Sequence, residues 1–310
     1  MRRFGLSTIL VVMLFMPASV FAQREGSAKG PATAAKLQAD LSVKLSADLN
    51  RMAASYNGVM GIFVKDLTSG ETFAINADTI FPQASSIKIP ILIELMRQAQ
   101  EGKLNLAERV EIHHAGLVGG SGVLQFFSDG GSAVSLRDIA VLMVVLSDNS
   151  ATNLIIDRVG MDNVNGMLRA LGLDRTVLAR KMIDIDAERA DRENRSTPRQ
   201  MGTLVEMLNA GKLLDAEHTK MALEILEYPK ESPLHSGVPE TITEAEKPGS
   251  LNGAQCDSGI VFLARRPYVI SVMTTFNPTN GDAVIASVSA RVFSYFDRVA
   301  HANSYGVHVR

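Results

Sequence analysis

The sequence lacks tryptophan altogether and holds one cysteine, Cys256, among its 310 residues. A single cysteine excludes an intrachain disulfide, although export to an oxidising compartment needs none when the core is large. No histidine lies near Cys256 in the sequence, which argues against a catalytic thiol. We interpret Cys256 as a structural residue at a strand edge or in a turn, since an unpaired cysteine usually behaves as a small buried hydrophobe.

An excess of charge of either sign is also missing. The chain has 31 Lys and Arg against 33 Asp and Glu, a formal net charge of −2. This balance argues against a nucleic-acid partner, because such proteins usually carry a basic face. Hydrophobic residues make up 46% and charged residues 21% of the chain, which is typical of soluble globular proteins. The length suffices for two subdomains.

Long apolar runs are absent except at the N-terminus. Two arginines precede an uncharged stretch, residues 4–16, and compact side chains occupy the −3 and −1 positions if cleavage follows Ala22. This pattern predicts a signal peptide over residues 1–22 and a disordered mature N-terminus over residues 23–33. We therefore expect a secreted or periplasmic protein with no stable membrane span after cleavage. An uncleaved anchor is the alternative.

Hydrophobic periodicity predicts the secondary structure. Leucines at every fourth position from Leu37 to Leu49 predict a helix over residues 34–56, and two β-rich runs, 59–64 and 71–75, predict a hairpin. The other predicted elements are helices over 86–102, 135–146, 151–159, 162–171 and 198–227, loops over 110–131 and 180–197, strands over 260–263 and 268–273, and a helix over 282–299.

Strands and a long helix thus occur near both ends of the chain, and helices dominate between them. The simplest architecture is an α/β domain assembled from residues 34–85 and 245–300, with an all-α part, residues 86–244, inserted between them. Residues 301–310 then form a C-terminal tail.

Ser85 and Lys88 open the helix that follows Phe81-Pro82-Gln83-Ala84. Residues three apart share one face of a helix, so the two side chains can meet. A serine hydroxyl needs a base within hydrogen-bond reach to become a nucleophile, and a lysine with a lowered pKa can serve. The alternative is a polar helix start followed by a solvated lysine, and Ser-x-x-Lys alone is a weak signal.

Two further motifs follow along the chain. Ser147-Asp148-Asn149 lies between two helical patterns, where a hydroxyl and a carboxamide can face one cavity; the alternative is a helix N-cap. Lys247-Pro248-Gly249-Ser250 precedes the C-terminal strands. Lys247 offers positive charge for a carboxylate, Gly249 permits close approach of a ligand, and the N–H of Ser250 can complete an oxyanion hole with that of Ser85. The alternative is a surface turn.

Together, and in this order, Ser-x-x-Lys, Ser-Asp-Asn and Lys-x-Gly resemble the motif set of the serine β-lactamase and penicillin-binding protein superfamily, and within it the class A β-lactamases. The resemblance covers nearly the whole mature chain. It implies a two-subdomain fold with an antiparallel sheet flanked by helices. It also implies a monomeric serine hydrolase without cofactor or metal, acting on a β-lactam or a D-Ala-D-Ala peptide.

The resemblance implies roles for the matching residues. Ser85 would attack the lactam carbonyl, with Lys88 as base or proton relay and Ser147 passing a proton to the leaving nitrogen. Asn149 would hold the amide of the substrate's side chain, and Lys247 would help to bind the substrate carboxylate.

Two features depart from the class A pattern. Pro248 stands where the family usually has threonine or serine, which removes a hydroxyl and a backbone donor. The family's Glu-x-x-Leu-Asn motif, whose glutamate activates the deacylating water, is absent from the stretch Arg180 to Glu188. Asp184 is the nearest carboxylate in approximate register, and Asp186 or Glu188 are the alternatives. The function open to test is therefore a β-lactamase, a D-Ala-D-Ala peptidase, or a β-lactam-binding protein that deacylates very slowly.

Overall fold

The computed structural model describes Met1 and residues 30–277, 279 and 281–309. The predicted signal peptide, residues 1–22, lies outside these residues apart from Met1, as do residues 23–29 of the expected mature N-terminus. The first helix, α1 (Gly30–Ser55), begins four residues before the position that leucine periodicity predicts.

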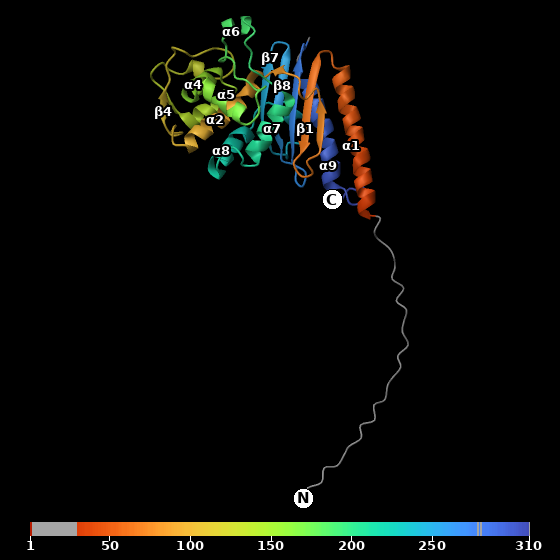
Figure 1. Cartoon of the computed structure of the whole chain (residues 1–310). Coiled ribbons are helices and arrows are strands. Elements are labelled where there is room, and N and C mark those ends of the chain that lie inside the picture. Colours follow the sequence, from red (N-terminus) through yellow and green to blue (C-terminus); the bar gives the residue numbers. More distant parts are fainter. Residues whose placement is uncertain (2–29, 278, 280, 310) are drawn as a thin grey trace.

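A five-stranded antiparallel sheet forms the centre of the molecule (Figure 1). It joins the two ends of the chain, because the strand after α1 pairs with the last strand of the sequence over eight residues. This confirms the predicted α/β fold with an antiparallel sheet. The strands in spatial order are β2 (Thr72–Ile75), β1 (Val59–Asp66), β9 (Tyr268–Thr275), β8 (Ala254–Val261) and β7 (Glu244–Leu251).

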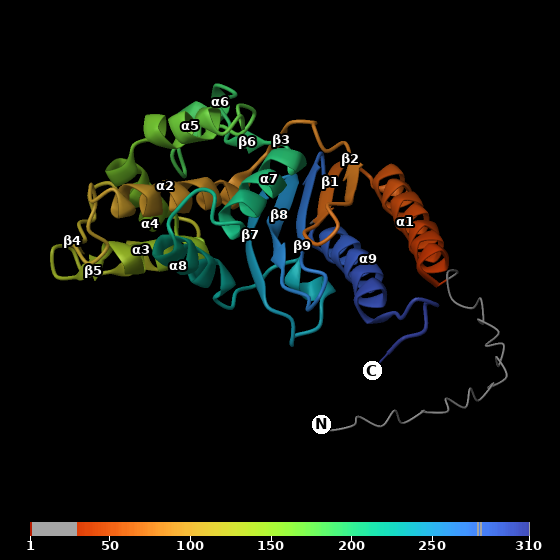
Figure 2. The same cartoon turned by 60° about the horizontal axis from the view of Figure 1, so that its bottom comes forward.

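Helices α1 and α9 (Asp282–His301) cover one face of the sheet (Figure 2). Leu45 and Leu49 of the predicted leucine stripe are fully buried there, as are Val288 and Val292 of α9. The packing follows from amphipathic helices placing their apolar stripes on the apolar face of a sheet.

The opposite face carries the helical part of the chain (Figure 2). At its centre lies α2 (Lys88–Gln100), whose residues from Lys88 to Met96 are all buried. A helix that is apolar nearly all round belongs in the middle of a core. Around it lie α3 (Leu136–Val145), α4 (Asn149–Val159), α5 (Met161–Ala170), α7 (Pro198–Asn209) and α8 (Ala216–Glu227).

Several elements differ from the sequence-based expectation. The expected loop 110–131 starts inside a small sheet, β4 (Arg109–Glu111) with β5 (Ala133–Ser135), and holds the short turn η2 (Leu124–Phe126). The expected loop 180–197 contains α6 (Ile185–Arg189) and β6 (Arg195–Ser196), which pairs with β3 (Phe81–Pro82). The helical pattern over 198–227 is two helices, α7 and α8. No described helix is long and apolar enough to cross a membrane.

Cys256 lies within β8, between β7 and β9, rather than at a strand edge or in a turn. Burial raises the pKa of its thiol to about 12. Its Sγ donates to the backbone oxygen of Gln83, 3.0 Å away. The expectation of a strand edge or a turn rested on the polar neighbours of Cys256 and was wrong, because these neighbours are buried as well. The buried thiol agrees with a structural role.

Candidate active site

Ser85 lies in η1 (Ala84–Ile87), a short turn that continues directly into α2. The preceding residue, Ala84, has a φ of +43°, a left-handed conformation that residues with a Cβ rarely adopt. Strained backbone of this kind occurs preferentially at functional sites. Ser85 is only half-buried, so its hydroxyl stays within reach of a ligand.

Lys88, one turn further on, is completely buried and lies between two serines. Its Nζ is 3.0 Å from the Oγ of Ser85 and 3.0 Å from the Oγ of Ser147, and it donates to the backbone oxygen of Ser147 at 2.7 Å. Burial, and then the charge of nearby Lys247, holds the pKa of Lys88 well below its usual range. A neutral amine in this position can accept the proton of the Ser85 hydroxyl.

The Ser147-Asp148-Asn149 motif occupies the turn between α3 and α4, where Ser147 has a φ of +52°. The buried carboxylate of Asp148 accepts from the N–H groups of Val123 (2.7 Å), Leu124 (2.8 Å) and Ala151 (2.9 Å). Asp148 therefore both caps α4 and holds the motif against the start of η2. The N-cap alternative is correct for Asp148, while Ser147 faces Lys88.

Asn149 lies in the same cluster and is almost fully buried. Its Oδ1 is 3.4 Å from Lys88 Nζ, and its Nδ2 donates to the backbone oxygen of Gly119 at 3.1 Å. The glycine-rich stretch after β4 makes these contacts possible. A Cβ on Gly122 would overlap the carboxyl group of Asp148, and one on Gly120 would lie 2.8 Å from Asn149 Nδ2.

The third motif lies on β7, an edge strand of the sheet. Lys247 is buried, its Nζ donates to the backbone oxygen of Pro248 at 3.1 Å, and burial lowers its pKa to about 8. The structure pairs Pro248 with Asp257, and an edge strand is where a sheet tolerates proline. The surface-turn alternative for this motif was wrong.

Gly249 brings β7 against the turn that bears Ser85. A Cβ at this position would lie 2.7 Å from the backbone nitrogen of Ser85 and 2.8 Å from that of Ser86. The hydroxyl of Ser86 donates to the backbone oxygen of Lys247 at 2.7 Å and so fixes the same contact. Ser250, the next residue, is exposed.

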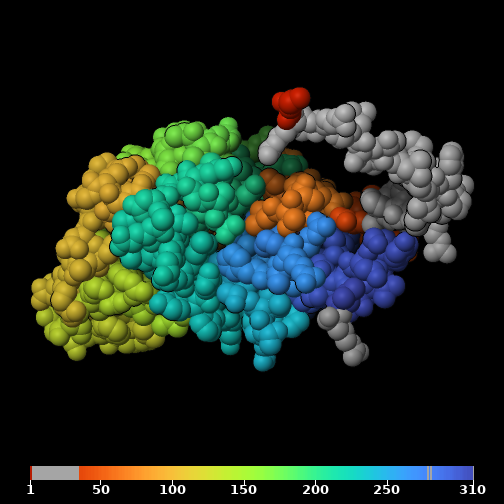
Figure 3. All heavy atoms as spheres, turned by 90° about the horizontal axis from the view of Figure 1, so that it is seen from below, coloured from red at the N-terminus to blue at the C-terminus, as the bar shows by residue number. Residues whose placement is uncertain are grey.

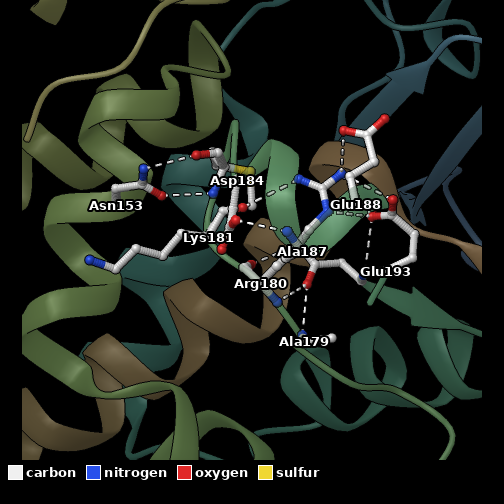
Figure 4. Close-up of polar contacts among 10 residues, drawn as sticks. Asn153, Ala179, Arg180, Lys181, Asp184, Ala187, Glu188 and Glu193 are labelled. Carbon is white, nitrogen blue, oxygen red and sulfur yellow. Dashed lines mark hydrogen bonds and ion pairs between the residues drawn. The ribbon is translucent and has the colours of Figure 1, made fainter. Parts of the chain in front are cut away.

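The loop between Arg180 and Asn194 holds the three candidate carboxylates, of which Figure 4 shows Asp184 and Glu188. Asp184 caps α6, because its Oδ1 accepts from the N–H of Ala187 at 3.0 Å. Asp186 and Glu188 are exposed. Among the described residues, no hydrogen bond joins any of these three carboxylates to Ser85, Lys88 or Ser147.

Sequence reasoning missed the residues that shape this loop. Arg180 is 6% exposed, and its guanidinium donates to both carboxylate oxygens of Glu193 at 3.0 Å (Figure 4). The buried side chain of Asn194 accepts from the N–H groups of Ala179 and Arg180 at 2.7 and 3.0 Å. These contacts close the base of the loop.

A second anchor joins the loop to α4. The side chain of Asn153 accepts from the N–H of Met182 at 2.8 Å and donates to its carbonyl at 3.1 Å (Figure 4). Asn153 is one helical turn beyond Asn149, so the same helix holds both the loop and the lysine cluster. The only signal in the sequence for this anchor is a second polar residue, Asn153, four positions after Asn149.

The histidine pair in the loop after β4 lies away from these clusters. His113 and His114 are both exposed, as expected. His113 Nε2 is 3.4 Å from Glu111 Oε2, and His114 Nε2 contacts the backbone oxygen of Phe127 at 2.7 Å.

The structure thus brings the three motifs, far apart in the sequence, to one site: a serine and a second serine share a buried lysine amine, next to another buried lysine. The fold and this site define a serine hydrolase. The profile of the Beta-lactamase enzyme family matches residues 44–296. The chain belongs to this family, as a class A serine β-lactamase-like member.

Similar protein sequences and similar solved structures support the assignment of the chain to this family. An imipenem-hydrolyzing β-lactamase of Enterobacter cloacae is 28% identical over 254 residues, covering 78% of this chain and 86% of that protein. A solved β-lactamase of Sphaerobacter thermophilus is 30% identical, with a TM-score of 0.72, and covers 82% of this chain and 95% of that one. The solved PBP-A is 28% identical with a TM-score of 0.75, covering 82% and 96%; a point mutant of PBP-A was solved as an acyl-enzyme with penicillin G.

Proposed function

We propose that this protein hydrolyses the amide bond of β-lactams through an acyl-enzyme at Ser85. The observation that carries the proposal is the position of the Lys88 amine, 3.0 Å from the hydroxyl oxygens of both Ser85 and Ser147. Neutral Lys88 takes the proton of Ser85 while Oγ attacks the lactam carbonyl. The C–N bond of the ring then breaks, and the proton reaches the leaving nitrogen through the hydroxyl of Ser147.

The remaining site residues bind the substrate in this proposal. The N–H groups of Ser85 and Ser250 stabilise the oxyanion, and the close contact of Gly249 with the Ser85 turn supports this pairing. Lys247 attracts the substrate carboxylate, and Asn149 binds the amide of the substrate's side chain. We also propose that the enzyme is a monomer and that it acts in the periplasm or outside the cell, and the N-terminal sequence pattern supports the export.

Deacylation needs a base for the attacking water, and Asp184 is the candidate. Its carboxylate already caps α6, which favours a second candidate function. In that alternative the acyl-enzyme formed with a β-lactam persists, and the protein acts as a β-lactam-binding protein, or as a D-Ala-D-Ala peptidase that releases the acyl group of its peptide substrate but not that of a β-lactam. The likeness to PBP-A, a mutant of which was solved as a penicillin G acyl-enzyme, supports the alternative.

Two kinds of measurement on the purified protein separate these functions. Steady-state nitrocefin turnover by the parent, lost in Ser85→Ala, supports the hydrolase. A stable penicillin adduct in intact-mass spectra without turnover supports the binding protein, and release of D-Ala from a muropeptide supports the peptidase. Equal nitrocefin rates for the parent and Ser85→Ala would refute acylation at Ser85.

A matched pair of variants tests the deacylation base. Asp184→Asn keeps a side-chain oxygen that can cap α6 but removes the basic carboxylate, whereas Asp186→Asn changes an exposed neighbour. If Asp184 is the base, only the first variant slows decay of the adduct, by about a hundredfold. Equal decay in both variants would exclude Asp184 from this role.

A further inference from the structure

The C-terminal end of α9 gathers three metal-ligating side chains that the active site does not use. Asp297, His301 and His308 place one ligand atom each within 4.8 Å of one another. No other trio of histidine, cysteine, aspartate or glutamate ligand atoms comes this close within the described part of the chain. We infer that these residues form a binding site for a first-row divalent cation of the zinc, nickel or copper type.

Two of the ligands lie on one face of the helix. Asp297 and His301 are four residues apart in the last turn of α9. His301 Nδ1 is 3.1 Å from Asp297 Oδ1 and 3.0 Å from the backbone oxygen of Asp297, and a bound ion would replace the second contact. Side chains at this spacing project from the same face of a helix and can coordinate one ion. The helix also ends here, and the partial negative charge of a helix C-terminus favours a cation.

The third ligand comes from a turn that folds back on the helix. Ala302 bridges to His308, and the N–H of Val309 donates to the backbone oxygen of His301 at 2.7 Å. The side chain of Asn303 accepts from the N–H groups of Tyr305 (2.9 Å) and Val307 (3.0 Å) and shapes the turn. As a result, the imidazole of His308 lies beside that of His301, with 5.3 Å between the ring centres.

The ligand set selects the kind of metal. Two imidazoles and one carboxylate suit zinc, copper and nickel, whereas magnesium and calcium prefer oxygen ligands alone. Tetrahedral zinc with bonds of about 2.1 Å needs ligand atoms about 3.4 Å apart. Asp297 and His301 already meet this spacing, and His308, which is exposed, can close the remaining gap by rotating its side chain.

Such an ion would be structural. The C-terminal residues lie at the opposite end of the molecule from the helices around α2 (Figure 3), and α9 covers the sheet face opposite to the one that packs against the Ser85 turn. A bound ion would tie residues 302–309 to α9 and raise the stability of that end of the chain. This role is independent of the proposed function.

Titration calorimetry of the purified protein with zinc chloride tests the inference. We expect one equivalent of zinc to bind saturably, none of magnesium, and a rise in the melting temperature with zinc. His308→Ala should weaken zinc binding at least about tenfold, since even loss of residues that only support a ligand costs that much. His308 is exposed, so the variant should keep its fold, which circular dichroism checks.

A matched control comes from α8, where His218 Nδ1 forms a contact with Asp215 Oδ1 at 2.9 Å without a third ligand among the described residues. His218→Ala should leave zinc affinity unchanged. The inference is overturned if zinc does not bind saturably at one equivalent, or if His308→Ala binds it as tightly as the parent. In either case the contact of Asp297 with His301 is an ordinary polar contact between neighbouring helix turns.

Discussion

Glu193→Gln is expected to loosen the loop from Arg180 to Asn194 without changing its shape. Glutamine keeps one oxygen that can accept from Arg180, but it leaves a guanidinium that is 6% exposed without its bidentate carboxylate. Breaking a fully buried ion pair costs about 3–5 kcal/mol. Glu193 is 28% exposed and Glu188 lies 3.7 Å from Arg180, so we expect about 2 kcal/mol here.

The weakened pair of Arg180 with Glu193 should lower the free energy that is needed to open the loop. About 2 kcal/mol corresponds to about a thirtyfold larger opening constant. The amides of Ala179 and Arg180, which donate to Asn194, report it directly in hydrogen exchange followed by mass spectrometry. We expect their protection to fall about thirtyfold. Because the loop carries Asp184, the proposed deacylation base, deacylation should also slow, with little change in acylation.

Glu206→Gln provides the matched control for this prediction. It weakens the partly buried pair of Lys65 Nζ with Glu206 Oε1 (2.7 Å) on the sheet side of the molecule. Protection at Ala179 and Arg180 should remain as in the parent. If Glu193→Gln also leaves their protection unchanged, the ion pair does not hold the loop, and its assigned role is wrong.

Three other predictions concern the site and its surroundings. Gly249→Ala forces a Cβ to within 2.7 Å of the Ser85 backbone nitrogen and should slow acylation about a hundredfold in stopped-flow measurements, while Gly166→Ala on α5, whose Cβ would lie no closer than 3.9 Å to another residue, should not. Because burial lowers the pKa of Lys247 to about 8, its charge is present below and lost above that pH, so KM for a carboxylate-bearing β-lactam should rise between about pH 7.5 and 9. Burial raises the pKa of Glu246 to about 8, so its contribution to stability is present below about pH 4.5 and lost as the pH rises to 8; the melting temperature of Glu246→Gln should match the parent at about pH 5 and exceed it at about pH 8.5.

Local patterns predicted the elements that depend on local contacts. Ser135 accepts from the N–H of Asp138 at 3.0 Å and so caps the helix predicted over residues 135–146, and the two β-rich runs, 59–64 and 71–75, form the expected hairpin. The three motifs were each weak alone, and their order along the chain carried the assignment. These helix starts and hairpin turns are set by neighbouring residues, so a single sequence suffices to predict them.

Elements held by distant contacts could not be predicted in this way. Strand β7 contains Glu244, Glu246, Lys247 and a proline, a composition that is unusual for a strand. It is a strand because β8 pairs with it along its whole length, and its buried acids have polar partners in another segment, such as Lys230 Nζ at 3.2 Å from Glu246 Oε1.

The loop base shows the same limit. Arg180 and Glu193 occur in a polar segment that reads as solvated, and nothing local indicates that they pair. Asp184 was chosen by approximate register, and the structure shows it capping a short helix that the sequence did not reveal. Roles that depend on where a loop folds back require the structure, and for Asp184 they require the experiment above.

The most direct test of the account is to locate the covalent adduct. The protein is mixed with benzylpenicillin, quenched within a second, and analysed by intact and peptide mass spectrometry, with Ser85→Ala and Ser287→Ala, an exposed serine on α9, alongside. We predict one adduct with the mass of the whole antibiotic on the peptide that carries Ser85, present in Ser287→Ala and absent in Ser85→Ala. An adduct that persists in Ser85→Ala, or that maps to another residue, would contradict the account.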